Sequence, residues 1–141
     1  MPDIFRVSEA ASLALHAMVY LAAFPEEKIT TQTIAGALKA SEHHLAKVMQ
    51  RLVHAGLIRS TRGPAGGFQL NKSDREINLL EIYEAVDGPL EPRSCLLGSV
   101  PLCGGDRCFL GGLNVSVHQM VKNHFADTRL TSLTRIFGEK K

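Results

Sequence analysis

The stretch LAKVMQRLVHAGLIRSTRGPAGGFQL, which runs from Leu45 to Leu70, decides the fold. Its first half predicts a helix, because the apolar residues recur at the spacing of one helix face. They are Leu45, Val48, Met49, Leu52 and Val53. Ser41 is a suitable N-cap for this helix, and Gly56 stands where a helix commonly ends in the left-handed conformation.

The opposite face of this helix is polar and basic. His43, Lys47, Gln50 and His54 form one line on it, with His44 and Arg51 beside that line. After the helix, Leu57–Thr61 and Phe68–Leu70 predict two short strands joined by a glycine-rich turn over residues 62–67. A helix with a basic outer face, followed at once by a basic-tipped hairpin, is the outline of a winged helix-turn-helix that reads DNA.

The positive charge is concentrated in the same region. Residues 39–72 hold six basic residues and one acid, a local charge of +5 in a chain whose net charge is +2. The remainder of the chain therefore carries −3. Focused positive charge favours a polyanionic partner such as double-stranded DNA, although a solvated basic face would have the same composition.

Length and composition fit one domain with an appendage. The chain has 141 residues, of which 45% are hydrophobic and 21% charged, as in ordinary globular proteins. The most apolar run, Ala10–Phe24, is short for a bilayer span and contains Ser12 and His16. No export signal is evident, and three cysteines are an odd number for a disulfide framework. We therefore expect a cytoplasmic protein with no membrane partner.

Further helices are expected on both sides of the central stretch. Val7–Ala23 is apolar on almost every side, and Gln32–Leu38 forms a helix-turn-helix pair with the Ser41 helix. Asn78 and Glu81 have the spacing of a capping box, and Leu113–Phe125 is amphipathic. The pattern predicts a mostly α fold with a small β-wing.

Three segments follow from this order. Residues 1–88 form a winged helix-turn-helix DNA-binding domain, 89–112 a cysteine-rich loop, and 113–141 a dimerisation helix and tail. The first and last helices hold more apolar surface than one small head can cover. We therefore expect a homodimer whose two DNA-reading helices lie about one DNA turn apart, roughly 34 Å, on an inverted-repeat operator.

The cysteine loop contains Cys95, Cys103 and Cys108 within fourteen residues. Three thiols in a glycine-rich loop can converge on one point. Structural zinc uses four N or S ligands, often in pairs with two to four residues between them; seven residues separate Cys95 from Cys103 and four separate Cys103 from Cys108, and the ligand count is one short. Iron–sulfur clusters tolerate irregular spacing and a fourth ligand from elsewhere. Spacing alone also fits three incidental cysteines.

Several of these motifs together carry a resemblance that covers nearly the whole chain. They are Leu45–Leu52, Ala55–Ile58, Arg62–Leu70, Ile77–Leu80, Ala85–Gly88 and the three-cysteine loop before a long helix. The chain resembles the Rrf-type bacterial winged helix-turn-helix transcriptional regulators, the group that includes the iron–sulfur regulators IscR and NsrR. The resemblance implies a homodimer with paired winged heads and a long C-terminal dimerisation helix. It also implies a cluster that tunes operator binding.

The resemblance assigns the metal ligands as well. It implies that Cys95, Cys103 and Cys108 hold a [2Fe–2S] or [4Fe–4S] cluster, with a fourth ligand near the start of the first helix of the partner subunit. The corresponding position here is Ser12, a poor iron ligand. Glu9 and His16 lie within one turn of it and are the candidates.

The DNA contacts are expected on two elements. His43, His44, Lys47, Gln50 and Arg51 enter the major groove, while Arg59 and Arg62, with Gly66 in the same turn, meet phosphate or the adjacent minor groove. Gln50 and Arg51 are expected to read bases, because Gln pairs with adenine and Arg with guanine.

Three classes of function are compatible with these features to different degrees. The first is a repressor or activator that senses its cluster, and the second is a regulator whose cysteines sense redox state or bind another metal. An enzyme is disfavoured, although Cys108 could be a nucleophile. The Gly63–Gly67 turn lacks the Lys-Ser/Thr of a phosphate-binding loop, and no histidine is obviously placed to activate a thiol.

Overall fold

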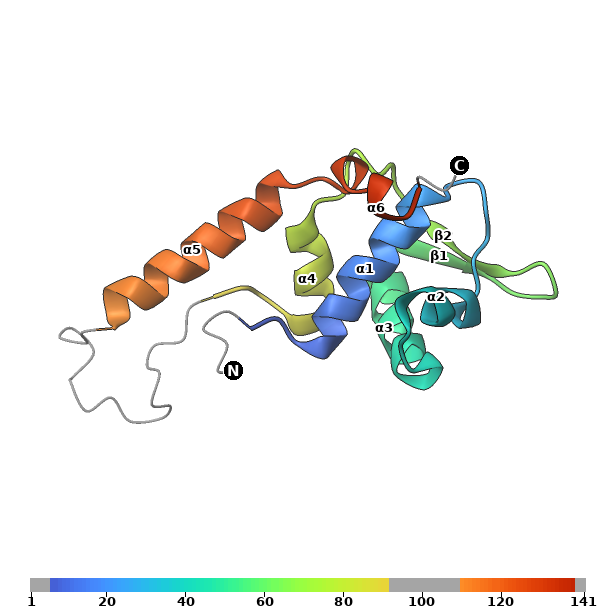
Figure 1. Ribbon diagram of the computed structural model, residues 1–141, viewed down its shortest axis with the longest axis horizontal. Coiled ribbons are helices and arrows are strands. Elements are labelled where there is room, and N and C mark those ends of the chain that lie inside the picture. Colours follow the sequence, from blue (N-terminus) through green and yellow to red (C-terminus); the bar gives the residue numbers. More distant parts are fainter. Residues whose placement is uncertain (1–5, 92–109, 139–141) are drawn as a thin grey trace.

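The computed structural model describes residues 6–91 and 110–138 (Figure 1). Its elements are α1 (Glu9–Ala23), α2 (Thr31–Leu38), α3 (Glu42–His54), β1 (Ile58–Thr61), β2 (Gly67–Leu70), α4 (Leu79–Asp87), α5 (Gly111–Asp127), the 3-10 turn η1 (Leu130–Ser132) and α6 (Arg135–Gly138). This order confirms the expectation of a mostly α fold with a small β-wing. Within the described residues, no helix is both long and apolar enough to cross a membrane.

Side-chain caps decide where the helices begin. Ser41 accepts a hydrogen bond from the backbone of His44, and Asn78 forms a complete capping box with Glu81, both as expected from sequence. The first helix begins at Glu9 rather than Val7, because the Ser8 side chain caps it.

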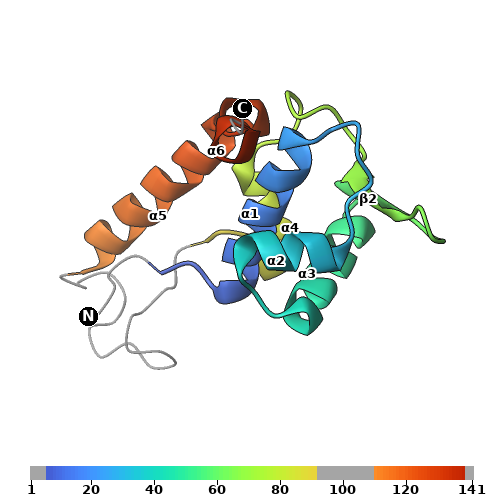
Figure 2. The same ribbon diagram turned by 45° about the vertical axis from the view of Figure 1, so that its right-hand side comes forward.

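The core is built around α1, which runs through the middle of the head (Figures 1 and 2). Its buried residues include Met18 and Leu21, and the apolar stripe of α3 packs against it, with Leu45 and Met49 fully buried. Helix α4 and the C-terminal turn also cover α1. Much of the apolar surface of the first helix is therefore covered within one chain.

The wing is the antiparallel hairpin β1–β2, in which Ile58 pairs with Leu70 and Thr61 with Gly67. The connector before α2 joins this hairpin, because Ile29 and Phe68 exchange two backbone hydrogen bonds of 3.1 and 2.8 Å. The side of β2 that faces the connector has no room for a side chain at Gly67. A Cβ there would lie 2.8 Å from the backbone of Lys28 and Ile29.

Helix α5 projects from the head, and the chain after it returns (Figure 1). The return is held by backbone hydrogen bonds from Leu79 N to Thr128 O and from Leu130 N to Ile77 O, 3.1 and 3.0 Å long. Phe125 and Leu130 are buried in the common core, whereas Leu113 and Met120 on α5 are 61% and 72% exposed. The C-terminal end of α5 is therefore anchored, and the rest of the helix carries exposed apolar side chains.

Candidate nucleic-acid interface

The helix-turn-helix consists of α2 and α3, joined by a short turn. Lys39 caps α2 in the left-handed conformation with φ 54°, and Ala40 N donates to Ala35 O at 3.0 Å. This turn places α3 with its apolar stripe inward. Four exposed residues form the outer line of α3, namely His43, Lys47, Gln50 and His54.

The wing adds exposed cations from a second element. Arg59 on β1 and Arg62 in the turn are exposed, while Ile58 on the same strand is buried. Gly66 has a role in folding, because a Cβ there would collide with the backbone oxygen of Thr61. Its amide donates to Gly63 O at 2.9 Å and closes the turn.

These cations form no ion pair within the described residues. The one ion pair found there joins His44 Nδ1 to Glu9 Oε1 at 3.5 Å, and it requires a protonated His44. Lys47, Arg59 and Arg62 are therefore free to meet an external anion, as far as the described part of the chain shows.

The flank of α3, defined as His44 and Arg51, has intramolecular partners. His44 faces Glu9 in the first turn of α1. Arg51 Nη1 donates a 3.0 Å hydrogen bond to the backbone oxygen of Val86 in the last turn of α4. Both flank residues were expected among the DNA contacts, but their partners could not be identified from sequence because they are far away in the chain.

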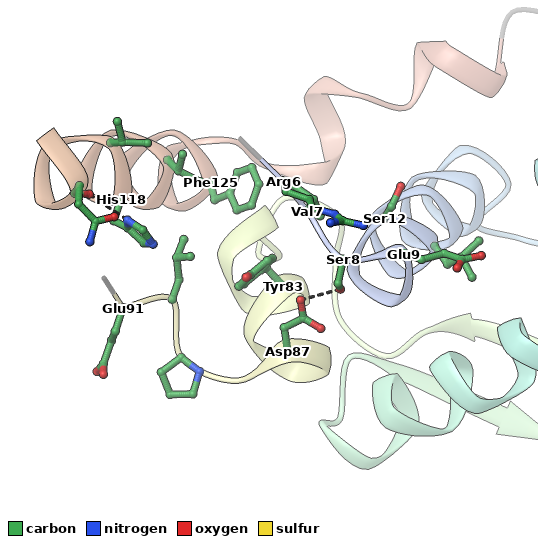
Figure 3. A pocket seen from close by; sticks show the side chains of 16 residues that line it. Arg6, Val7, Ser8, Glu9, Ser12, Tyr83, Asp87, Glu91, His118 and Phe125 are labelled. Carbon is green, nitrogen blue, oxygen red and sulfur yellow. Dashed lines mark hydrogen bonds between the residues drawn. The ribbon is translucent and has the colours of Figure 1, made fainter. Parts of the chain in front are cut away.

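A cavity of about 1050 Å³ lies beside this region, between the start of α1, the end of α4 and α5 (Figure 3). Tyr83 and Asp87 of α4 line it, and the Ser8 hydroxyl donates to Asp87 Oδ2 at 2.6 Å. Partial burial, and secondarily the charge of Asp87, raises the pKa of Tyr83 above its usual value.

Of the expected metal ligands, the structure describes Glu9 and His16. Cys95, Cys103 and Cys108 lie outside the described residues. Within the described ranges, no group of three or more His, Cys, Asp or Glu side chains could hold a metal ion. Glu9 lines the cavity with Ser12, whereas the exposed His16 directs its Nδ1 to Ser12 O of its own helix at 2.7 Å.

A two-helix reading unit followed by a β-hairpin with exposed cations defines a winged helix-turn-helix protein. The family model described as "Iron-dependent Transcriptional regulator" matches residues 7–136. The chain belongs to this family, Rrf2, which confirms the resemblance seen in its sequence.

Named relatives agree with this membership. The Rhodopseudomonas palustris protein BadM, whose name assigns it to the HTH-type regulators, is 38% identical over 77 residues, covering 55% of this chain and 49% of BadM. The HTH-type transcriptional regulator NsrR of Shouchella clausii is 32% identical over 91 residues, covering 64% of this chain and 61% of NsrR. The chain thus spans about half the length of the first curated relatives it matches.

A solved structure extends the likeness to almost the whole chain. CymR, named as the global cysteine regulator of B. subtilis, has a TM-score of 0.77 and 26% identity, and the match covers 94% of this chain and 98% of CymR. BadM, NsrR and CymR are all named as regulators and none as an enzyme, in agreement with the expectation from sequence.

Proposed function

We propose that this protein is a dimeric transcriptional regulator that binds an inverted-repeat DNA operator through α3 and the wing. The observation that carries the proposal is the outer line of α3, whose four polar residues are exposed on the second helix of a helix-turn-helix. Two wing arginines that form no ion pair in the described structure supply further charge for phosphate. Membership of a regulator family supports the same function.

The contacts divide by chemistry. Gln50 and His43 on the outer line have the hydrogen-bonding groups to read base edges, and Lys47 beside them suits phosphate. Arg59 and Arg62 meet phosphate or the minor groove, with Gly66 shaping the turn that presents them. His44 and Arg51 approach the same groove from the flank, where their side chains already have partners.

Arg62→Ala tests this division. The variant should bind every duplex more weakly and lower the slope of log K against log salt by about one, because one phosphate contact is lost. The preferred duplex is first selected from a random pool, and affinity is then measured by fluorescence anisotropy over a series of salt concentrations.

Gln50→Ala is the matched control. It should lower discrimination at one or two base pairs and leave the salt slope unchanged. If Arg62→Ala altered preference at one base pair and kept the parent slope, the proposed division would be wrong.

The second copy is proposed to pack against α5. Leu113 and Met120 are exposed large apolar side chains seven positions apart on this helix, so they lie on one face of it. Pairing two such helices would remove that surface from water and hold two heads in fixed relation.

The cofactor proposed for the cysteine segment is an iron–sulfur cluster, of either [2Fe–2S] or [4Fe–4S] type. Cys95, Cys103 and Cys108 supply three thiolates, the donor that such clusters prefer. Glu9 of the partner subunit or His16 of the partner subunit would supply the fourth ligand. Both side chains are exposed in the single chain, so neither would have to leave a buried position. When bound, the cluster supplies a redox- and ligand-sensitive group.

A second candidate is a regulator whose cysteines sense redox state or bind another metal. The specific support is the near-complete structural match to CymR, a protein named as a cysteine regulator rather than for iron. The two candidates differ in whether the purified protein holds iron and sulfide.

Anaerobic purification of the parent and of a Cys95, Cys103 and Cys108 triple alanine variant separates them. With a cluster, the parent should be brown or red and contain iron and sulfide, and the triple variant should be colourless. Glu9→Ala and His16→Ala identify the fourth ligand, since loss of the true ligand should speed cluster decay without preventing assembly. A colourless parent that contains no iron, with thiols that titrate as a redox couple, would contradict the cluster and favour the second candidate.

A further inference from the structure

The polar residues of α3 belong to two different surfaces. The outer line is exposed and has no side-chain hydrogen bond or ion pair in the described structure, whereas His44 and Arg51 on the flank each meet another helix. The two flank residues are seven positions apart, close to two helical turns, so they lie on the same side of α3. That side faces the start of α1 and the end of α4.

The acceptor of Arg51 is a helix-end carbonyl. The last four carbonyls of a helix have no partner within it, and the helix dipole gives that end partial negative charge. The amide that would continue the helix onto Val86 O is that of Leu90, which instead donates to Glu84 Oε2 at 3.3 Å. The Arg51 guanidinium takes this place at 3.0 Å with a charge-assisted hydrogen bond.

The same turn of α4 also holds α1. The neighbouring residue Asp87 accepts the 2.6 Å hydrogen bond from Ser8, and Ser8 in turn accepts from Ala11 N at 3.0 Å as the N-cap of α1. Two successive residues of α4 thus contact two other helices. The side chain of Asp87 contacts the start of α1, and the backbone oxygen of Val86 contacts the last turn of α3.

We propose that Arg51 is a positioning residue, which fixes the DNA-reading helix α3 against the C-terminal turn of α4 instead of reading a base. The inference rests on the proposed DNA-binding function of α3. Its consequence is that a displacement of the α4 turn changes the angle at which the outer line is presented.

The test compares Arg51→Ala and Arg51→Lys with Lys47→Ala. Lys47 is a matched control because it loses the same charge one turn earlier on α3 and has no ion-pair partner in the described structure. Arg51→Ala should lower the Tm of DNA-free protein by roughly 3 °C, since a helix-end hydrogen bond is lost. Lys47→Ala should leave Tm within about 1 °C.

DNA binding provides the readout that distinguishes positioning from contact. Arg51→Ala should weaken binding about tenfold, equally on the selected duplex and on each single-base variant of it, with the parent salt slope. Arg51→Lys, which keeps a charged donor, should recover part of both Tm and affinity. Lys47→Ala should lower the salt slope by about one.

A double-mutant cycle adds an independent readout. Asp87→Ala touches the same turn of α4 and not the outer line, so its effect on DNA affinity should be non-additive with Arg51→Ala and additive with Lys47→Ala. Three results for Arg51→Ala would each overturn the inference. They are a loss of preference at one base pair only, a reduced salt slope, and an unchanged Tm. If the parent itself preferred no duplex, the proposed function would fail, while the Tm comparison would still decide whether Arg51 holds α4.

Discussion

Tyr83 lines the cavity and lies close to the Asp87 carboxylate at the end of α4. Its phenol is partly withdrawn from water and lies near Asp87, and both effects raise its pKa above the ordinary value of about 10. The folded state therefore holds the phenolic proton more tightly than the unfolded chain does. The resulting stability is fully present below about pH 10 and is lost as pH rises through the folded pKa.

Tyr83→Phe should remove this part of the alkaline loss of stability. Urea unfolding of parent and variant at about pH 8 and again above about pH 10 should show the parent losing more stability than the variant. Tyr20→Phe is the control, because Tyr20 is the other tyrosine of the chain, and it leaves Tyr83 to be titrated alone by tyrosinate absorbance. A Tyr83 that titrated at or below its ordinary pKa in that variant would contradict the prediction.

Individual residues also show how much of the interface can be predicted from sequence. The outer line of α3 could be predicted because the helical period of about 3.6 residues is enough to assign each residue to the buried stripe or to the opposite face. The partners of the flank could not. Arg51 and Val86 are 35 positions apart, as are Glu9 and His44, so their meeting depends on how α1, α3 and α4 pack. The predicted cysteine ligands lie outside the described residues and stay predictions.

Among the elements, the wing depends on a close approach of two backbones. Gly67 has φ +154°, and a Cβ would lie 2.8 Å from the backbone at Lys28 and Ile29. Gly67→Ala should therefore lower the free energy of unfolding by about 2 kcal/mol, because the Ile29–Phe68 bridge must open or the strand must strain. Chemical denaturation measures the change.

Gly36→Ala is the corresponding control, since this glycine is exposed inside α2 and a Cβ added to it would have nothing within 4 Å. It should raise stability by up to about 1 kcal/mol through helix propensity. A Gly67→Ala variant as stable as Gly36→Ala would show that the bridge does not constrain the wing.

The hairpin illustrates a similar division for elements. The predicted strand starts differ from the observed ones by one residue, and the predicted strand ends agree with the structure. The prediction succeeds because the residues that favour a turn act locally. The pairing of Ile29 with Phe68 was missed, since a single bridging residue between two helices shows no alternation of apolar and polar residues. The observed start of α5 at Gly111 and its end at Asp127 likewise exceed the predicted Leu113–Phe125 at both ends, because glycine and polar residues add little to an apolar period.

At the scale of the molecule, the exposed apolar residues of α5 predict the state of association. Met120 is 72% exposed, and Met120→Asp would place a charge in the proposed contact. It should raise the dimer dissociation constant roughly tenfold or more, through lost burial and an unpaired charge. Analytical ultracentrifugation over a dilution series measures this.

Asn123→Asp adds the same charge to exposed α5 surface without removing an apolar group, and it should dissociate no more readily than the parent. Equal weakening by both variants would argue for general charge repulsion. A monomeric parent at micromolar concentration would contradict the dimer itself.

The anchoring of α5 at one end makes it a lever arm. Its 17 residues at about 1.5 Å each give an arm roughly 25 Å long. A tilt of about 10° at the anchored end, near Phe125, would move the opposite tip by about 4 Å, a little less than the pitch of one helical turn. A small repacking between α4 and α5 is thus magnified before it reaches whatever the tip touches. A small tilt of α5 at its anchored end can therefore change the distance between the head and whatever the tip contacts, without altering the structure of either.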